Sequence, residues 1–94
     1  MRYRIIDTRS SGKTSRLMLL AKETNSIIAC ANPYAMKQKA LAYGIVGIDF
    51  ISYNDLLSGE YDSYDIMIDE IEIFISQYVC PNNKLNGYTL SVED

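Results

Sequence analysis

Short apolar runs alternate with helical patterns along this sequence, and the alternation constrains the fold more than any other feature. The strand-like runs lie at residues 2–6, 26–31, 48–53, 66–68 and 88–92, and the helical patterns lie at 13–24, 33–43 and 70–78. Alternation of this kind predicts an α/β domain, because parallel strands must be joined by a crossover that is usually a helix. We expect three layers, with a mostly parallel sheet of about five strands and helices on both faces.

The first two helical segments have the clearest boundaries and faces. Asn32 is a good N-cap residue and Pro33 suits the first helical position, whereas Gly44 is suited to ending this helix near residue 43. We expect both helices to bury one apolar face. The expected faces are Leu17, Met18, Leu20 and Ala21 in the first helix, and Met36, Ala40 and Tyr43 in the second.

The second half of the chain has weaker boundary signals. Asn54 is expected to cap a short helix that runs through Leu57 and ends at Gly59. The continuous apolar run at 66–68 is typical of a strand covered on both faces. The alternating run at 88–92 predicts a last strand with one wetter face, placed either inside the sheet or at its edge.

The composition predicts one soluble domain that spans residues 1–94. Hydrophobic residues make up 48% of the chain, which is enough for a core, and the net charge is −3. An acidic balance argues against a broad surface for nucleic acid phosphates, and the scattered tyrosines are better explained by packing than by base stacking. Without a run long enough to span a bilayer, and with too short an apolar start for a signal peptide, a cytoplasmic protein without membrane contact is expected.

The two cysteines are not expected to form a site. Cys30 and Cys80 stand far apart in the sequence, and the chain contains no histidine. We expect both thiols to be reduced and buried as small hydrophobic groups, without a zinc ion.

A loop rich in small residues joins the first strand to the first helix. It reads Asp-Thr-Arg-Ser-Ser-Gly-Lys-Thr at 7–14, and its second half has the chemistry of a phosphate-binding loop. Gly12 would let the backbone approach phosphates, Lys13 would supply an ammonium, and Thr14 would supply a hydroxyl for Mg²⁺. A lysine in the first turn of a helix is unfavourable unless an anion lies nearby, so its placement favours an anion site.

Two adjacent carboxylates follow the apolar run at 66–68. Asp69 and Glu70 come at the carboxyl end of that strand, and Gly12 and Lys13 follow the first strand in the same way. In parallel sheets ligands bind at the carboxyl ends of strands, so we expect the loop and the carboxylates to meet. Asp69 would help to hold Mg²⁺, and Glu70 would orient or deprotonate a water molecule.

Together these segments resemble the P-loop NTPases, in the branch with a catalytic glutamate that includes helicases, AAA-type ATPases and viral packaging motors. The resemblance implies a P-loop-like fold, with Lys13 and Glu70 as catalytic residues and Thr14 and Asp69 as Mg²⁺ ligands. It also implies binding of ATP, or less favourably GTP. By the same resemblance the nucleotide-binding loop consists of Arg9, Ser10, Ser11, Gly12, Lys13, Thr14 and Ser15.

The loop departs from the family pattern at its first position, where Asp7 replaces the usual glycine. Phage terminase ATPases tolerate such a replacement and carry an arginine inside the loop, as Arg9 does here. The resemblance therefore points to a minimal phage-encoded ATPase core in the cytoplasm of a bacterial host. No arginine finger can be assigned, so we expect weak turnover alone and dependence on a protein partner or on assembly of several copies. Nucleic acid would be contacted only indirectly.

Two other functions stay open at this point. The chain could be a nucleotide-binding regulatory or interaction module of a phage or mobile element that does not hydrolyse its ligand. The small size and the carboxylate of Asp7 near the phosphates favour that alternative. A nucleoside kinase shares the Ser11-Gly12-Lys13-Thr14 sequence and a downstream Asp-Glu, but such kinases usually add a zinc-bearing region that this chain lacks.

Overall fold

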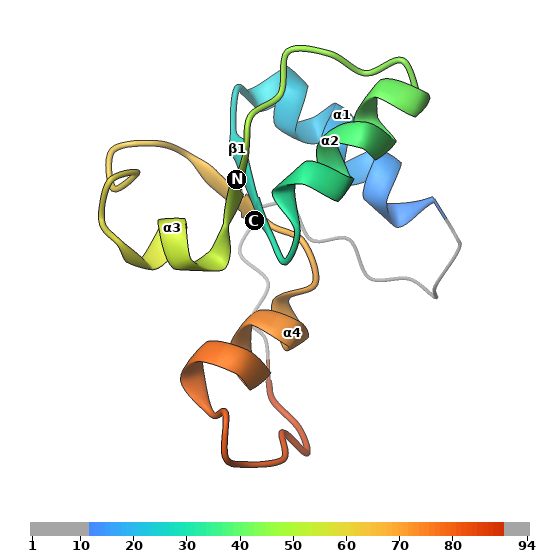
Figure 1. Cartoon of the computed structure of the whole chain (residues 1–94). Coiled ribbons are helices and arrows are strands. Elements are labelled where there is room, and N and C mark those ends of the chain that lie inside the picture. The colour runs from blue at the N-terminus through green and yellow to red at the C-terminus, as the bar shows by residue number, and fades with distance from the viewer. Residues whose placement is uncertain (1–11, 90–94) are drawn as a thin grey trace.

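The chain folds as an α/β unit around a small parallel sheet (Figure 1). A computed structural model describes residues 12–89. Along the described chain the elements are α1 (Lys13–Thr24), β1 (Ile27–Cys30), α2 (Pro33–Ala42), β2 (Phe50–Ser52), α3 (Tyr53–Leu57), β3 (Ile66–Ile68), α4 (Ile71–Phe74) and the π-helix η1 (Ile75–Val79). Within that range the order of the strands is β2-β1-β3, so β1 is central.

Both strand pairs are parallel, and β1 is buried along its whole length. Ile28 pairs with Phe50 of β2 and with Met67 of β3. All four residues of β1 are buried, as expected of a central strand covered on both faces. Parallel pairing places the carboxyl ends of the three strands at one edge of the sheet, and the candidate site lies there.

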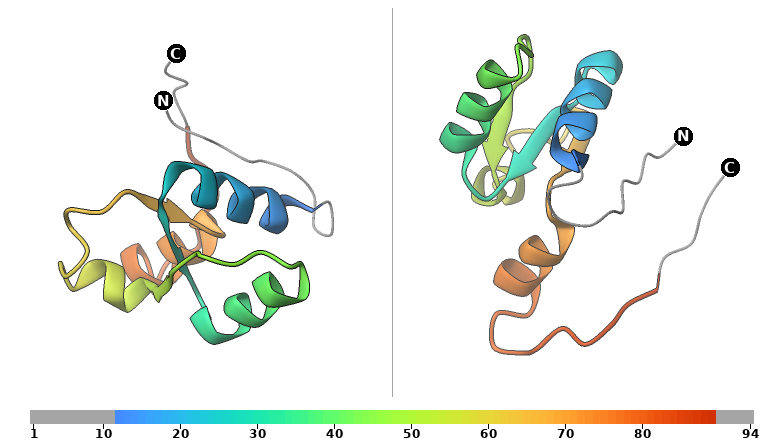
Figure 2. Two further views of the ribbon diagram at one scale, coloured as in Figure 1. Left: turned by 90° about the horizontal axis from the view of Figure 1, so that it is seen from above. Right: turned by 90° about the vertical axis from the view of Figure 1, so that its right-hand side faces the viewer.

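The two faces of the sheet have separate hydrophobic clusters because side chains alternate along β1. Ile28 and Cys30 face α1 and α2, in a cluster completed by Met18, Ala21, Met36, Ala40 and Ile45. Ile27 and Ala29 face the opposite way, in a cluster with Ile51 and Tyr53, against which side chains of α3, β3 and α4 pack. Helices therefore cover both faces of the sheet (Figure 2).

The first two helices lie where the sequence predicts them. The Asn32 side chain accepts a hydrogen bond from the Ala35 N–H at 3.1 Å, and Pro33 is the first residue of α2. Gly44 follows this helix with a φ of +74°, a conformation that suits glycine. The prediction for Tyr43 was wrong, because this side chain is exposed at the C-cap position, beyond the last buried turn.

Two predictions in the second half need correction. Ser52, not Asn54, caps α3: its hydroxyl accepts from the Asp55 N–H at 3.0 Å, and the Asp55 carboxylate accepts from the Ser52 N–H at 3.3 Å. This reciprocal capping box satisfies two backbone donors that would otherwise lack helical partners. The strand β3 is only half-buried, rather than fully covered on both faces.

The helix expected at 70–78 is divided. Four residues form α4, and the chain then widens into the π-helix η1, which ends at Val79 before Pro81. This segment extends beyond the carboxyl ends of the strands (Figure 1). It packs back through Phe74 and Tyr78, whose rings lie 5.2 and 5.7 Å from the ring of Tyr53.

Several predictions concern residues that the structure does not describe. The strand at 2–6 and the loop residues Asp7, Arg9, Ser10 and Ser11 all lie outside the described residues. Of the strand predicted at 88–92, only residues 88 and 89 are described, and neither is in a strand. The described sheet therefore has three strands, fewer than the five that the sequence suggested.

Candidate functional site

The candidate site lies at the carboxyl edge of the sheet, where α1 begins and β3 ends. Gly12 immediately precedes α1 and has a φ of +83° and a ψ of 12°, in the left-handed region that favours glycine. This conformation turns the chain directly into the helix, and the Gly12 carbonyl accepts the Arg16 N–H at 3.1 Å. Lys13 is consequently the first residue of α1, where the free N–H groups of the helix favour an anion.

Lys13 and Glu70 meet across this edge. The Lys13 ammonium lies 3.4 Å from a carboxylate oxygen of Glu70, and the two side chains are 24% and 37% exposed. Two groups of opposite charge thus come from the start of the first described helix and the end of β3. Their partial exposure keeps both within reach of a ligand from solvent.

Asp69 lies beside this ion pair and is half-buried. Its N–H donates to the Ala29 carbonyl at 2.9 Å, which extends the pairing of β3 with β1 by one residue. Burial raises the pKa of the Asp69 carboxyl and the neighbouring Glu70 carboxylate raises it further, whereas the ammonium groups of Lys13 and Lys39 lower it. The carboxyl is therefore poised to gain from a further cation.

Glu70 is held in an unusual backbone conformation. Its φ of 57° and ψ of 62° place it in the left-handed region, which non-glycine residues adopt infrequently. Its carbonyl accepts the N–H groups of Ile73 and Phe74 at 3.0 and 3.2 Å, so the bend leads directly into α4. Residues held in such conformations are enriched at functional sites.

A buried tyrosine fixes the backbone of both carboxylates. The hydroxyl of Tyr53 donates to the Asp69 carbonyl at 2.6 Å and lies 3.4 Å from the Glu70 carbonyl. Tyr53 is only 1% exposed, and burial, with the nearby Asp69 carboxylate, raises the pKa of its hydroxyl to about 12. The hydroxyl thus stays protonated as a donor. No local pattern in the sequence indicates this role for Tyr53.

The remaining loop residues contribute less to the described geometry. Thr14 is half-buried at the second position of α1. The Ser15 hydroxyl donates to the Gly12 carbonyl at 2.9 Å, so it stabilises the start of the helix. The predicted positions Arg9, Ser10 and Ser11 lie outside the described residues.

The described residues do not supply a full set of protein ligands for a metal ion. Within residues 12–89 there is no group of three or more acidic, cysteine or histidine residues that could hold a metal. Mg²⁺ is normally bound through one or two carboxylates together with waters and substrate phosphates. Of the described residues, Asp69 offers a carboxylate and Thr14 a hydroxyl for such shared binding.

Cys30 adds a neutral neighbour to the site. Both cysteines are free thiols; Cys30 is buried, but Cys80 is only half-buried, against expectation. Burial and the Asp69 carboxylate raise the pKa of the Cys30 thiol to about 11, so it stays protonated and unreactive. The thiol contributes packing behind Asp69 rather than chemistry.

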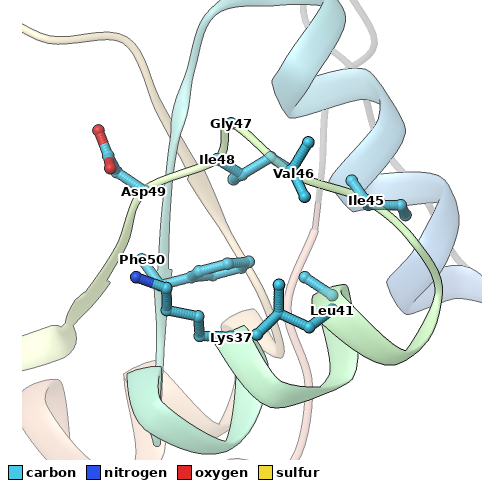
Figure 3. A pocket seen from close by; sticks show the side chains of 9 residues that line it. Lys37, Leu41, Ile45, Val46, Gly47, Ile48, Asp49 and Phe50 are labelled. Atoms are coloured by element: carbon cyan, nitrogen blue, oxygen red, sulfur yellow. The ribbon is translucent and has the colours of Figure 1, made fainter.

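A separate hollow lies beside the amino end of β2, and Lys13, Asp69 and Glu70 are not among its lining residues. It has a volume of about 310 Å³, and its walls come from α2, the loop at 45–49 and the start of β2 (Figure 3). The lining side chains are mainly apolar, with Lys37 and Asp49 as the charged members. No motif in the sequence predicts a site here.

Comparison with known proteins does not assign this chain to a family. No protein family, curated protein or solved structure matches the chain. In the described part of the chain no helix has both the length and the apolar character needed to cross a membrane.

Proposed function

We propose that this protein binds the phosphates of a nucleoside triphosphate with Mg²⁺ at the carboxyl edge of its sheet, and hydrolyses the terminal phosphate weakly. The observation that carries the proposal is the meeting of Lys13 and Glu70 at this edge, with Asp69 beside them. ATP is the favoured nucleotide and GTP is the second choice. The described residues alone leave the base and ribose without an assigned site.

In this proposal the start of α1 binds the phosphates. The backbone N–H groups that follow Gly12 face the anion, and the ammonium of Lys13 neutralises its charge. Gly12 has room for that approach, because a Cβ built on it would lie 3.8 Å from its nearest neighbour, the Ser15 hydroxyl. Thr14 and Asp69 would hold Mg²⁺, which supplies charge neutralisation when bound.

Glu70 is proposed to be both a partner of Lys13 and the base for the attacking water. While the site is free of phosphate, the two groups form the 3.4 Å ion pair. A phosphate that draws Lys13 away would leave the Glu70 carboxylate free to accept a proton from water. Phosphate binding would thereby activate the water, because Lys13 would exchange Glu70 for the phosphate.

The resemblance to P-loop NTPases supports this proposal through residue order and chemistry. A strand at 2–6 would complete the strand–loop–helix unit and would give a sheet of four strands in a P-loop-like, three-layered domain. A minimal phage-encoded ATPase core, working in a bacterial cytoplasm with a protein partner or with copies of itself, is the biological setting that we propose.

A combined binding and hydrolysis experiment tests the proposal. Mg-ATP should raise the midpoint of thermal unfolding of the wild-type protein, and phosphate release should be measurable. Lys13→Ala should weaken binding by about 10- to 100-fold, because a hydrogen bond to a charged group contributes roughly 1.5–3 kcal/mol. Lys84→Ala, which removes an exposed ammonium elsewhere, is the matched control. Equal responses of the wild-type and Lys13→Ala proteins would refute the phosphate site.

A non-hydrolysing nucleotide-binding module is the second candidate. The ion pair favours it in one respect: Glu70 would remain engaged if the phosphate failed to displace it from Lys13. This alternative predicts thermal stabilisation by Mg-ATP without phosphate release above that of Glu70→Gln. The same experiment therefore separates the two functions.

A further inference from the structure

The charges of this chain are sharply segregated along the sequence. Residues 13–39 contain five lysines and arginines and one carboxylate, whereas residues 40–83 contain eight carboxylates and neither lysine nor arginine. The division between these segments falls within the last turn of α2. Because α1 and α2 cover one face of the sheet, and α3 with the loop after it lies against the other, the fold converts this pattern into two oppositely charged surfaces.

The basic surface is formed by the outer sides of α1 and α2. It carries Lys22, Lys37 and Lys39, all exposed, and within residues 12–89 none of the three ammonium groups forms a salt bridge, although Lys39 is near enough to Asp69 to lower the pKa of its carboxyl. Leu19 and Leu41 are exposed on the same two helices, at 55% and 52%. This surface therefore combines an excess of positive charge with apolar side chains.

The acidic surface is formed by α3 and the loop that leads to β3. Its exposed carboxylates are those of Asp55, Glu60, Asp62 and Asp65. Leu57 and Tyr64 are exposed among them. In the described part of the chain these carboxylates form no ion pair, so this surface mirrors the basic one with the opposite sign.

We propose that the basic surface of one molecule docks onto the acidic surface of a second copy of the same chain. The two surfaces lie on opposite faces of the sheet, so the contact joins different patches and repeats from molecule to molecule. Complementary charge guides the approach, and the exposed leucines and tyrosine supply apolar area once the surfaces touch.

A second copy explains both surfaces, whereas a nucleic acid would explain only the basic one. The whole chain carries a net charge of −3, which opposes the approach of a polyanion. A nucleic acid would also leave the acidic surface without a partner. Self-docking gives both the basic and the acidic surface a partner, and it requires no other kind of molecule.

Sedimentation of charge-reversed variants tests the proposal. The first variant, Lys22→Glu with Lys37→Glu, makes both surfaces acidic; the second, Glu60→Lys with Asp65→Lys, cancels the net negative charge of the acidic surface and leaves the basic one unchanged. These side chains are exposed, so the variants should keep the wild-type far-ultraviolet circular dichroism. Lys84→Glu has the same effect on net charge as one lysine reversal, at a position outside the basic surface.

The wild-type protein should show an average mass that rises with concentration at about 20 mM salt and falls to the monomer mass at about 0.5 M salt, where screening is strong. Each reversed variant alone should associate at least about tenfold more weakly, and an equimolar mixture of the two should associate again. Lys84→Glu should behave as the wild type does.

Three results would overturn the proposal. The first is a wild-type protein that stays monomeric at low salt, and the second is a pair of variants that associate as strongly as the wild type. The third is a monomeric wild-type protein that binds a single-stranded oligonucleotide through Lys22 and Lys37, which would assign the basic surface to nucleic acid.

Discussion

The two ends of this sheet differ in kind. At the carboxyl edge Lys13, Asp69 and Glu70 converge on one another, and a buried hydroxyl holds the backbone beneath them. Beside the opposite end of β2 the chain leaves a hollow of about 310 Å³, in which Lys37 and Asp49 are the charged lining residues. The hollow has space but no converging polar groups, whereas the edge brings an ammonium and two carboxylates together.

That difference shows why a site should be sought by its chemistry as well as by its volume. Parallel strands direct the loops that follow them to one edge, so side chains far apart in the sequence meet there. The hollow is bounded by α2, the loop at 45–49 and the start of β2. We therefore assign the proposed chemistry to the edge, and the following changes test the contrast.

The largest effect should come from Glu70→Gln. Removing the proposed base should lower the rate of phosphate release by about 10²- to 10⁴-fold. The same change breaks the ion pair with Lys13, so nucleotide should bind up to about fivefold more tightly, since exposed pairs contribute roughly 0.2–1 kcal/mol. Single-turnover phosphate release and calorimetric titration measure the two effects.

Glu72→Gln is the matched control, because Gln can still accept the hydrogen bond that the Tyr88 hydroxyl donates at 2.7 Å. Glu72→Gln should leave the rate of phosphate release and the affinity for nucleotide unchanged. If Glu72→Gln and Glu70→Gln reduced turnover equally, Glu70 would have no special role.

A smaller effect is expected from Tyr53→Phe. The ring contacts with Phe74 and Tyr78 would remain, but the hydrogen bond to the Asp69 carbonyl would be lost. The free energy of unfolding should fall by about 1 kcal/mol, and phosphate release should slow severalfold because the carboxylates lose their support. Denaturant titration and steady-state kinetics measure these changes.

Tyr78→Phe removes a hydroxyl from the same aromatic cluster but leaves the hydrogen bond to the Asp69 carbonyl intact. It should change the free energy of unfolding and the rate of phosphate release by less than Tyr53→Phe does. Loss of stability in Tyr53→Phe with an unaltered kcat would show that Tyr53 supports the fold but not the site.

The raised pKa of Asp69 predicts a modest pH dependence of stability. The folded protein holds the Asp69 proton more tightly than the unfolded chain does. The free energy of unfolding should therefore fall as pH rises from the ordinary Asp pKa of about 4 through the raised pKa. Asp69→Asn should remove this part of the slope in denaturant titrations at several pH values, and Asp49→Asn, at the hollow, should not. Identical slopes for all three proteins would contradict the assignment.

The smallest effect should follow a change in the hollow. Leu41→Ala truncates a side chain that is 52% exposed, so the free energy of unfolding should change by no more than about 0.5 kcal/mol. Affinity for Mg-ATP, measured by calorimetry, should be unchanged. A marked loss of affinity would move the ligand from the edge to the hollow.

Local patterns in the sequence were sufficient to predict much of the fold. The helical periodicity of 13–24 and the Asn32-Pro33 start signal correspond to α1 and α2, and the apolar runs correspond to β1 and β3. These features depend on residues close together in the chain. The contact between Lys13 and Glu70 followed from one further rule, that parallel strands end at the same edge.

Other features could not be predicted from the sequence, because they depend on small differences between similar local signals or on contacts between distant residues. Ser52 and Asn54 are both good cap residues, and Asp55 three residues after Ser52 decides between them by completing the capping box. Tyr43 continues the helical pattern but lies past the last buried turn. The role of Tyr53 requires a hydroxyl and a carbonyl sixteen residues apart, a pairing that no local pattern reports.

Titration with Mg-ATP, followed by the backbone amide signals of ¹⁵N-labelled protein, tests the central claim most directly. We expect the signals of Gly12, Lys13 and Thr14, with those of Asp69 and Glu70, to shift together and saturate, and we expect the signals at 45–49 to stay in place. Shifts confined to 45–49, or no saturable shift at either place, would contradict a phosphate site at the carboxyl edge.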